Sequence, residues 1–190
     1  MTSTGCLVTS TPDFTPPKRT RPFLVTATAD PDPRNFQILD APPGGLLAPS
    51  FSADVVSDDQ GQRVAGRLYI DYGNSNPGGA PFQQFYKVKP LDAGTMADTK
   101  ARRIKANTPL AYTIVSGWHT ATLMVSHSFA DGECPVCLND SSQISWPLYR
   151  CNSLESADSC KPTSPMIEMW SPGCPAVADP ESGETCGALP

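Results

Sequence analysis

The side chains with the widest range of chemistry in this chain are its seven cysteines. Cys134 and Cys137 form a Cys-Pro-Val-Cys sequence, a spacing typical of one half of a tetrahedral zinc site. A structural zinc site needs a second such pair, whereas the other cysteines stand singly, and a thioredoxin-like redox site needs a βαβ context that is missing. We therefore expect no metal and no cofactor, with zinc as the less favoured alternative. Disulfides are expected at Cys134, Cys137, Cys151, Cys160, Cys174 and Cys186.

Strand geometry limits which of these cysteines can pair. If strands near 119–129 and 144–151 are antiparallel neighbours, Cys134 and Cys151 lie at opposite ends, roughly 20 Å or more apart at about 3.3 Å per residue. A disulfide needs Cα atoms within about 7 Å. Cys134 and Cys137 therefore pair with each other or with the returning tail. The pairing that we favour leaves four cysteines to pair among themselves: Cys151, Cys160, Cys174 and Cys186.

The two histidines are the next candidates for metal binding or catalysis. His119 and His127 lie on one face of a single predicted strand, about 26 Å apart at strand rise. They are too far apart to share an ion, so we expect each to be a half-buried residue with a satisfied hydrogen bond. No Ser/His/Asp nucleophile motif, metalloprotease motif or glycine-rich phosphate loop occurs. The sequence therefore predicts that the protein is not an enzyme.

Charged residues gather in turns and in one short basic run. The acidic ones suit a calcium site at one end of a sandwich, but the preference of Asp for turns explains them more simply. The basic run at 100–105 alternates between two strand faces, which favours a solvated sheet edge over a nucleic-acid patch. The acidic turn residues are Asp30, Asp32, Asp58, Asp59, Asp131 and Glu133.

Several aromatic residues lie near predicted loops and polar faces. Exposed aromatic side chains often anchor a protein or glycan partner, although most aromatic residues in small sandwiches belong to the core. We consider both interpretations for Tyr69, Phe82, Phe85, Tyr86 and Trp118.

Bulk composition narrows the functional classes. The net charge of −5 and the pI of about 4.9 argue against binding to nucleic acid or to an anionic membrane surface. No apolar window reaches the 18 or so residues that a transmembrane helix needs. The 21 prolines and 14 glycines require many turns and disfavour long regular elements.

The candidate cysteines, histidines and aromatic residues must be positioned by short strands, because apolar residues recur with a period of two between turn clusters. This pattern predicts an all-β fold, specifically an immunoglobulin-like antiparallel β-sandwich over residues 22–151. Residues 1–21 are rich in Pro and Thr and predict an extended, flexible tether. Residues 152–190 predict an irregular, disulfide-tied tail. The expected strands cover 23–29, 36–41, 51–57, 63–73, 83–89, 119–129 and 144–151.

Two parts of the chain resemble known proteins. The sequence Ser-Thr-Gly-Cys at 3–6 resembles the end of a bacterial lipobox, with Ser3 where that pattern has a leucine-like residue. The resemblance implies that Cys6 receives lipid, and Leu7, in place of aspartate, implies sorting to the outer membrane. The domain resembles uncharacterised outer-membrane lipoproteins of myxobacteria-type Gram-negative bacteria with an immunoglobulin-like domain. The segments that resemble them are PDFTPPKRTRPFL, SFSADVVSDD, LYIDYG, HTATLMVSHSF and SQISWPLYRC.

Together these features predict an exported, non-enzymatic lipoprotein of the cell envelope. It is expected to be a structural or accessory subunit that binds protein or glycan partners through its sandwich, and to meet the membrane only through an N-terminal lipid. If Cys6 is lipidated, six cysteines are left for three disulfides. The alternative is a secreted structural subunit of an extracellular assembly, such as a filament or surface layer, and a zinc-stabilised module is the third possibility.

Overall fold

A computed structural model of the protein describes residues 21–39, 49–57, 62–93, 101–107, 115–130, 134–151 and 162. The predicted tether, apart from residue 21, and nearly all of the predicted tail lie outside these residues. So do four of the cysteines considered above: Cys6, Cys160, Cys174 and Cys186. The proposed domain boundaries therefore stay predictions.

The described residues form β-strands and one short 3-10 helix, η1, at Leu138–Asp140, which confirms the predicted all-β class. Alternating apolar residues and β-branched side chains favour the longer strands. The strands are β1 (Phe23–Asp30), β2 (Gln37–Leu39), β3 (Ser50–Val56), β4 (Val64–Ile70), β5 (Gln84–Leu91), β6 (Arg102–Asn107), β7 (Gly117–Ser126), β8 (Phe129–Ala130), β9 (Cys134–Pro135) and β10 (Ser141–Arg150).

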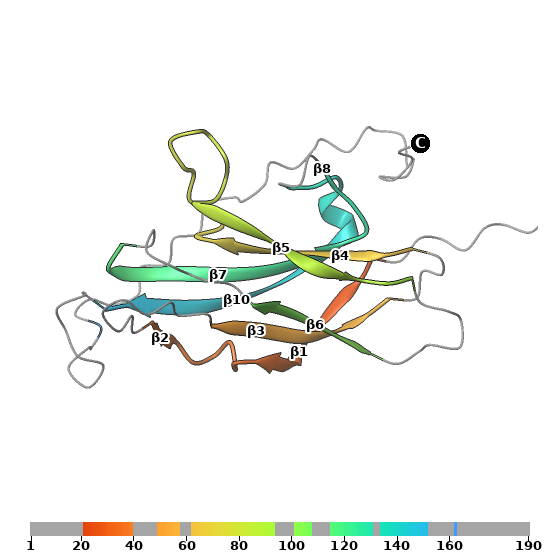
Figure 1. The fold of residues 1–190 in the computed structure, drawn as a ribbon, viewed down its shortest axis with the longest axis horizontal. Helices are drawn as coiled ribbons and strands as arrows, with labels where there is room; N and C mark the ends of the chain where they lie inside the picture. Colours follow the sequence, from red (N-terminus) through yellow and green to blue (C-terminus); the bar gives the residue numbers. More distant parts are fainter. Residues whose placement is uncertain are drawn as a thin grey trace, which may run out of the picture.

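Two sheets lie one above the other as layers (Figure 1). The smaller sheet has the strand order β1-β3-β6, and the larger has the order β2-β10-β7-β4-β5. Neighbouring strands in both sheets are antiparallel except β2, which runs parallel to β10. A small β8-β9 hairpin lies between β7 and β10 in the sequence. The antiparallel pairing of β7 with β10 agrees with the arrangement assumed for the cysteine geometry.

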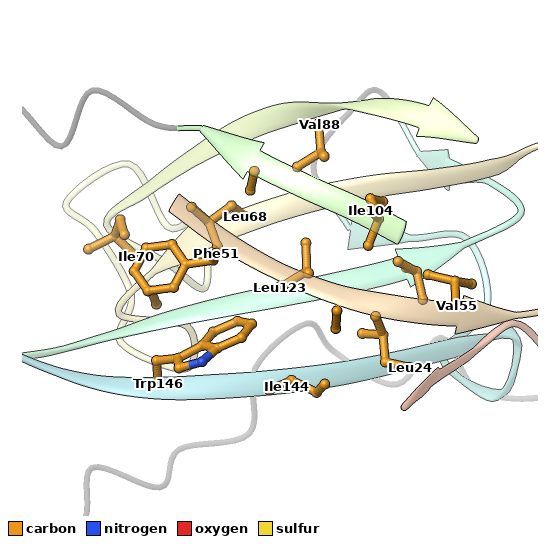
Figure 2. Close-up of a cluster of buried hydrophobic side chains, with 14 of the residues drawn as sticks. Leu24, Phe51, Val55, Leu68, Ile70, Val88, Ile104, Leu123, Ile144 and Trp146 are labelled. Carbon is orange, nitrogen blue, oxygen red and sulfur yellow. The ribbon is translucent and has the colours of Figure 1, made fainter. Parts of the chain in front are cut away.

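The main core fills the space between the two sheets, and Figure 2 shows its side chains converging from both layers. Phe51, Ala53 and Val55 of β3 face inward, as their alternation predicts, and each is at most 1% exposed. Ala121, Leu123 and Val125 of β7 face them from the larger sheet and are fully buried. Burial of such side chains stabilises a fold by about 1.5–3 kcal/mol each, so this core holds the two sheets together.

Two residues without an ordinary strand side chain mark special positions in the larger sheet. A Cβ atom added at Gly66 would lie 2.6 Å from Cδ1 of Ile104, so glycine permits the close approach of β4 to β6. Pro147 lies in β10, where β2 pairs only from Leu148 onward. The missing N–H of Pro147 is therefore on a stretch of β10 that is locally an edge, as expected for proline in a strand.

The sequence predicted most strands, and the structure adds two details. Residues 102–105 of the basic run lie in the edge strand β6, which agrees with the predicted sheet edge, and Ile104 and Ala106 of this strand are buried in the core. Strand β7 ends at Ser126, so Phe129 does not continue the inward face and instead packs in a second cluster outside the larger sheet. A turn stabilised by a Ser126 Oγ hydrogen bond to Ser128 O, 3.0 Å long, causes this change of direction.

Candidate functional site

The larger sheet has aromatic side chains on its outer face as well as in the core. Tyr69, Phe82 and Met124 form a buried group there, which we call the loop cluster, under the connection between β4 and β5. The ring centroids of Tyr69 and Phe82 are 5.0 Å apart, and the guanidinium of Arg67 lies 4.6 Å from the centroid of Phe129. This geometry makes the loop cluster a second small core that supports residues 71–83.

The interpretation of Tyr69 and Phe82 as exposed contact residues is wrong. Tyr69 is 0% exposed and Phe82 is 3% exposed, because the β4–β5 connection and the β8-β9 segment cover the outer face at this point. Phe85 packs against the same cluster, and Tyr86 packs against the main core. Alternation along β4 correctly separated Tyr69 from Leu68, but it contains no information about which loops cover the outer face.

Trp118 is partly exposed, as Phe85 and Tyr86 are, but it packs against a separate cluster formed by Tyr149 and Cys151. Its ring makes edge-on contacts with Phe36, at a centroid distance of 5.5 Å, and with Tyr149, at 5.2 Å. We call Phe36, Trp118 and Tyr149 the aromatic row. Phe36 is 45% exposed, and Ile38, which is paired with Tyr149, is 44% exposed.

The positions of the aromatic row follow from strand pairing. Trp118 of β7 is paired with Tyr149 of β10, and Tyr149 is paired with Ile38 of β2, so three neighbouring strands place apolar side chains side by side on one face. Sequence reasoning found Trp118 but missed Phe36 and Tyr149. The pairing of β2 with the last strand could not be predicted from the sequence, because 111 positions separate Ile38 from its partner Tyr149.

The aromatic row provides contact area and no reactive group. Rigid aromatic side chains at the centre of an interface contribute large binding energies because they bury much surface at low entropy cost. Such a surface suits a protein segment or the apolar face of a sugar ring.

His119 lies near the start of β7, and His127 directly follows its last residue. His119 is 8% exposed, and its Nδ1 lies 2.7 Å from Oδ2 of Asp71. Its Nε2 donates to Val115 O at 2.8 Å, and Thr120 N donates to Oδ1 of Asp71 at 2.9 Å. Because a carbonyl and a carboxylate face the two ring nitrogens, the site favours the doubly protonated imidazolium.

The pKa of His119 depends on two opposing effects, the burial of its ring and its contacts with Asp71 and the Val115 carbonyl. Burial of the ring lowers the pKa, but the hydrogen bond to Asp71, the charge of that carboxylate and the Val115 carbonyl outweigh burial. The net result is a pKa above the ordinary value of 6.5. We call His119, Asp71 and the Val115 carbonyl the His119 clasp, since together they tie the start of β7 to the end of β4.

His127 forms a similar pair at the other end of β7. Its Nδ1 lies 2.7 Å from Oδ1 of Asp140, and its backbone N donates to Oδ2 of Asp140 at 3.2 Å. Ser126 Oγ also lies 3.4 Å from Oδ2 of Asp140. Although Ser, His and Asp meet here, Ser126 is fully buried and donates to a backbone carbonyl, so its hydroxyl is not placed as a nucleophile. The three residues tie η1 to the end of β7.

The acidic turn residues that the structure describes pair with arginines. Asp32 accepts hydrogen bonds from Arg34, and this contact lowers its pKa to about 2. Asp30 lies 4.0 Å from Arg103. Within the described part of the chain, no group of three or more His, Cys, Asp or Glu side chains could hold a metal ion. The other acidic candidates, Asp58, Asp59, Asp131 and Glu133, lie outside that part.

The basic run is an outer sheet edge that is tied to its own sheet. Arg103 donates to the Thr28 carbonyl and to Ser52 Oγ, both at 2.8 Å, and lies 3.3 Å from Asp54. This arginine therefore bridges all three strands of the smaller sheet. The arrangement agrees with a solvated sheet edge and leaves Arg103 poorly placed to bind phosphates.

Cys134, Cys137 and Cys151 are each disulfide-bonded. Cys137 lies at the η1 end of β10, whereas Cys151 directly follows the other end, beside Tyr149. The ten residues of β10 separate these two positions by about 30 Å, far beyond the reach of a disulfide. The pairing of individual cysteines stays a prediction.

Comparisons with known proteins add no family to this picture, since no family model, curated protein or solved structure matches the chain. Among the described residues, no helix is long and apolar enough to cross a membrane.

Proposed function

We propose that this protein is a non-enzymatic lipoprotein of the cell envelope, a structural or accessory subunit that binds protein or glycan partners through its β-sandwich. Lipid on Cys6 would hold the sandwich at the outer membrane, and disulfides would suit the oxidising environment outside the cytosol. The observation that supports partner binding is the aromatic row, with Phe36 45% exposed beside Trp118 and Tyr149.

An immunoglobulin-like fold is the architecture that we propose for the domain. Immunoglobulin-type domains place strands A, B and E in one sheet and strands G, F and C in the facing sheet, with C′ added next to C in the variable type. The orders β1-β3-β6 and β10-β7-β4-β5 follow this arrangement if β1 is strand A and β10 is strand G. The buried Trp146 lies on β10, whereas antibody domains have their core tryptophan on strand C.

Binding through the aromatic row predicts that Phe36→Ala abolishes most partner capture. Loss of an exposed aromatic anchor weakens binding by about tenfold or more when it lies in the contact. Wild-type and variant proteins would be compared by glycan array and by cross-linking pull-down from native envelopes. Phe23→Ala is a matched control, because Phe23 is similarly exposed, at 51%, but belongs to the smaller sheet. Equal capture by both variants would exclude the aromatic row as the binding surface.

Anchoring predicts a modified Cys6 in the mature protein. We expect mass spectrometry of protein extracted from native membranes to show acyl groups on the peptide that contains Cys6, and Cys6→Ser to release the protein from the membrane fraction. Each buried methylene of a lipid contributes about 0.8 kcal/mol to membrane affinity, so loss of acylation should be evident in fractionation. An unmodified Cys6 in a mature chain would refute the anchor.

A further inference from the structure

The four edge strands of the two sheets differ in how they are protected against pairing. Natural sheets protect their edges with charged residues, proline or bulges, because an open edge pairs readily with another strand. The edge strands of the larger sheet are β2 and β5, and β5 carries Lys87, Lys89 and Pro90. In the smaller sheet, β6 has three basic residues, and β1 departs from regular pairing between Val25 and Asp30.

Strand β2 is the exception among these edges. Its residues, Gln37–Leu39, include no charged residue and no proline. Ile38 is 44% exposed and the preceding Phe36 is 45% exposed, so apolar side chains accompany the unprotected backbone. Within the described residues, β10 is the only strand paired with β2. The edge therefore lacks the charged residues, proline and irregular pairing that protect the other three edges, and short length is the one protective feature that it has.

The backbone of β2 is oriented so that the N–H and C=O groups of one residue point away from the sheet. Leu39 O accepts a hydrogen bond from Cys151 N at 3.3 Å, so the polar backbone groups of Leu39 point toward β10. Successive residues of a strand direct these groups to opposite sides, and those of Ile38 therefore point away from the sheet. In an antiparallel hydrogen-bonded pair, two opposed residues exchange both N–H···O bonds. Ile38 can form this pair with Ile38 of a second copy, which makes the edge self-complementary.

We propose that two copies of this chain associate through antiparallel pairing of their β2 strands, with Ile38 opposite Ile38 on a two-fold axis. A two-fold interface requires one surface to match itself, and an uncharged strand with a single outward residue meets this requirement. The axis is perpendicular to the sheet, so the two five-stranded sheets join with their outer faces on the same side. Because β2 is short, most of the contact energy comes from burial of Ile38, which is 44% exposed in the single chain.

This dimer goes beyond the proposed partner binding and does not depend on it. It would place the two aromatic rows on one continuous face, so a repetitive partner could contact both copies. Two linked sites bind such a partner more tightly than one, without any new contact.

Sedimentation velocity of the full, oxidised chain tests the proposal. We expect a monomer–dimer equilibrium for the wild type and a dissociation constant about tenfold or more higher for Ile38→Lys, which removes apolar contact and opposes two like charges. Phe23→Lys is the control, since Phe23 is 51% exposed but belongs to the smaller sheet, and it should leave the equilibrium unchanged. Far-UV circular dichroism would verify that each variant is folded.

A mixing experiment separates direct pairing from a general loss of association. Ile38→Lys and Ile38→Asp should each be monomeric, and an equimolar mixture should recover dimer because Lys then lies opposite Asp. A wild-type chain that stays monomeric throughout the concentration series would overturn the proposal, as would a dimer that Ile38→Lys leaves intact or a mixture that recovers no dimer. None of these results bears on partner capture by Phe36, so the two proposals fail separately.

Discussion

Asp71→Ala is expected to lower the free energy of unfolding by about 3–5 kcal/mol, because it removes one partner of a buried ion pair. The change leaves His119 Nδ1 and Thr120 N without the carboxylate that both contact at under 3 Å. Asp71 also has a φ of 54°, in the left-handed region, where alanine is less favourable than aspartate or asparagine. Equilibrium urea unfolding of the oxidised protein, followed by circular dichroism, measures the loss.

Asp71→Asn is the informative companion, since asparagine retains the shape, tolerates the positive φ and still accepts from Thr120 N. Its amide can donate to His119 Nδ1 while Nε2–H of the neutral ring donates to Val115 O. We therefore expect a smaller loss of stability than in Asp71→Ala. Losses of equal size in the two variants would mean that the carboxylate charge, and not the hydrogen-bonding shape, dominates the His119 clasp.

The His119 clasp also gives stability a definite dependence on pH. The pKa of His119 is raised in the folded state, so the folded protein binds the proton more tightly than the unfolded chain. This contribution is fully present below about 6.5, the ordinary value, and is lost as the pH rises through the folded pKa. The difference in stability between wild type and Asp71→Asn should therefore shrink from pH 6 to pH 9. A difference that is constant or grows over this range would contradict the charged clasp.

Local pattern was sufficient for much of the fold. Alternation in β3 and β7 correctly identified their inward faces, since a strand that is buried on one face must repeat every second residue. The same signal was ambiguous for β6, where arginines and lysine surround only two inward residues, Ile104 and Ala106. An edge strand carries charged residues on its exposed positions. These residues make the alternation of inward and outward positions hard to recognise in the sequence.

The candidate site was harder to predict because its parts come from distant segments. His119 was recognised as a strand residue with a satisfied hydrogen bond, but its partner Asp71 is 48 positions away. Phe36 makes its edge-on contact with Trp118 only because β2 pairs with the far end of β10. Conversely, the sequence left open whether Tyr69 is a contact residue or a core residue, because nothing in the strand itself reveals that the β4–β5 connection folds back over it. Long-range topology, and not residue type, decides these positions.

Trp146→Ala is expected to destabilise the sandwich by about 3–5 kcal/mol, the usual range for deletion of a buried tryptophan. Trp146 is fully buried between the sheets, and its ring centroid lies 5.0 Å from that of Phe51 on the opposite sheet (Figure 2). Its Nε1–H also donates to the Pro31 carbonyl, which follows β1. One side chain thus joins the larger sheet to both β3 and the end of β1, and its loss leaves a cavity that neither sheet can close alone.

Trp146→Phe separates the two contributions of this side chain. Phenylalanine retains the contact with Phe51 but cannot donate to the Pro31 carbonyl, so we expect a smaller loss, of about 1–3 kcal/mol. Phe23→Ala, at a 51% exposed position of β1, should change stability by less than about 0.5 kcal/mol in the same urea measurement. If Trp146→Ala were no more destabilising than Phe23→Ala, the two sheets would not depend on a shared core. Their association would then have to come from contacts such as the hydrogen bond that Leu24 N of β1 donates to Ser142 Oγ of β10.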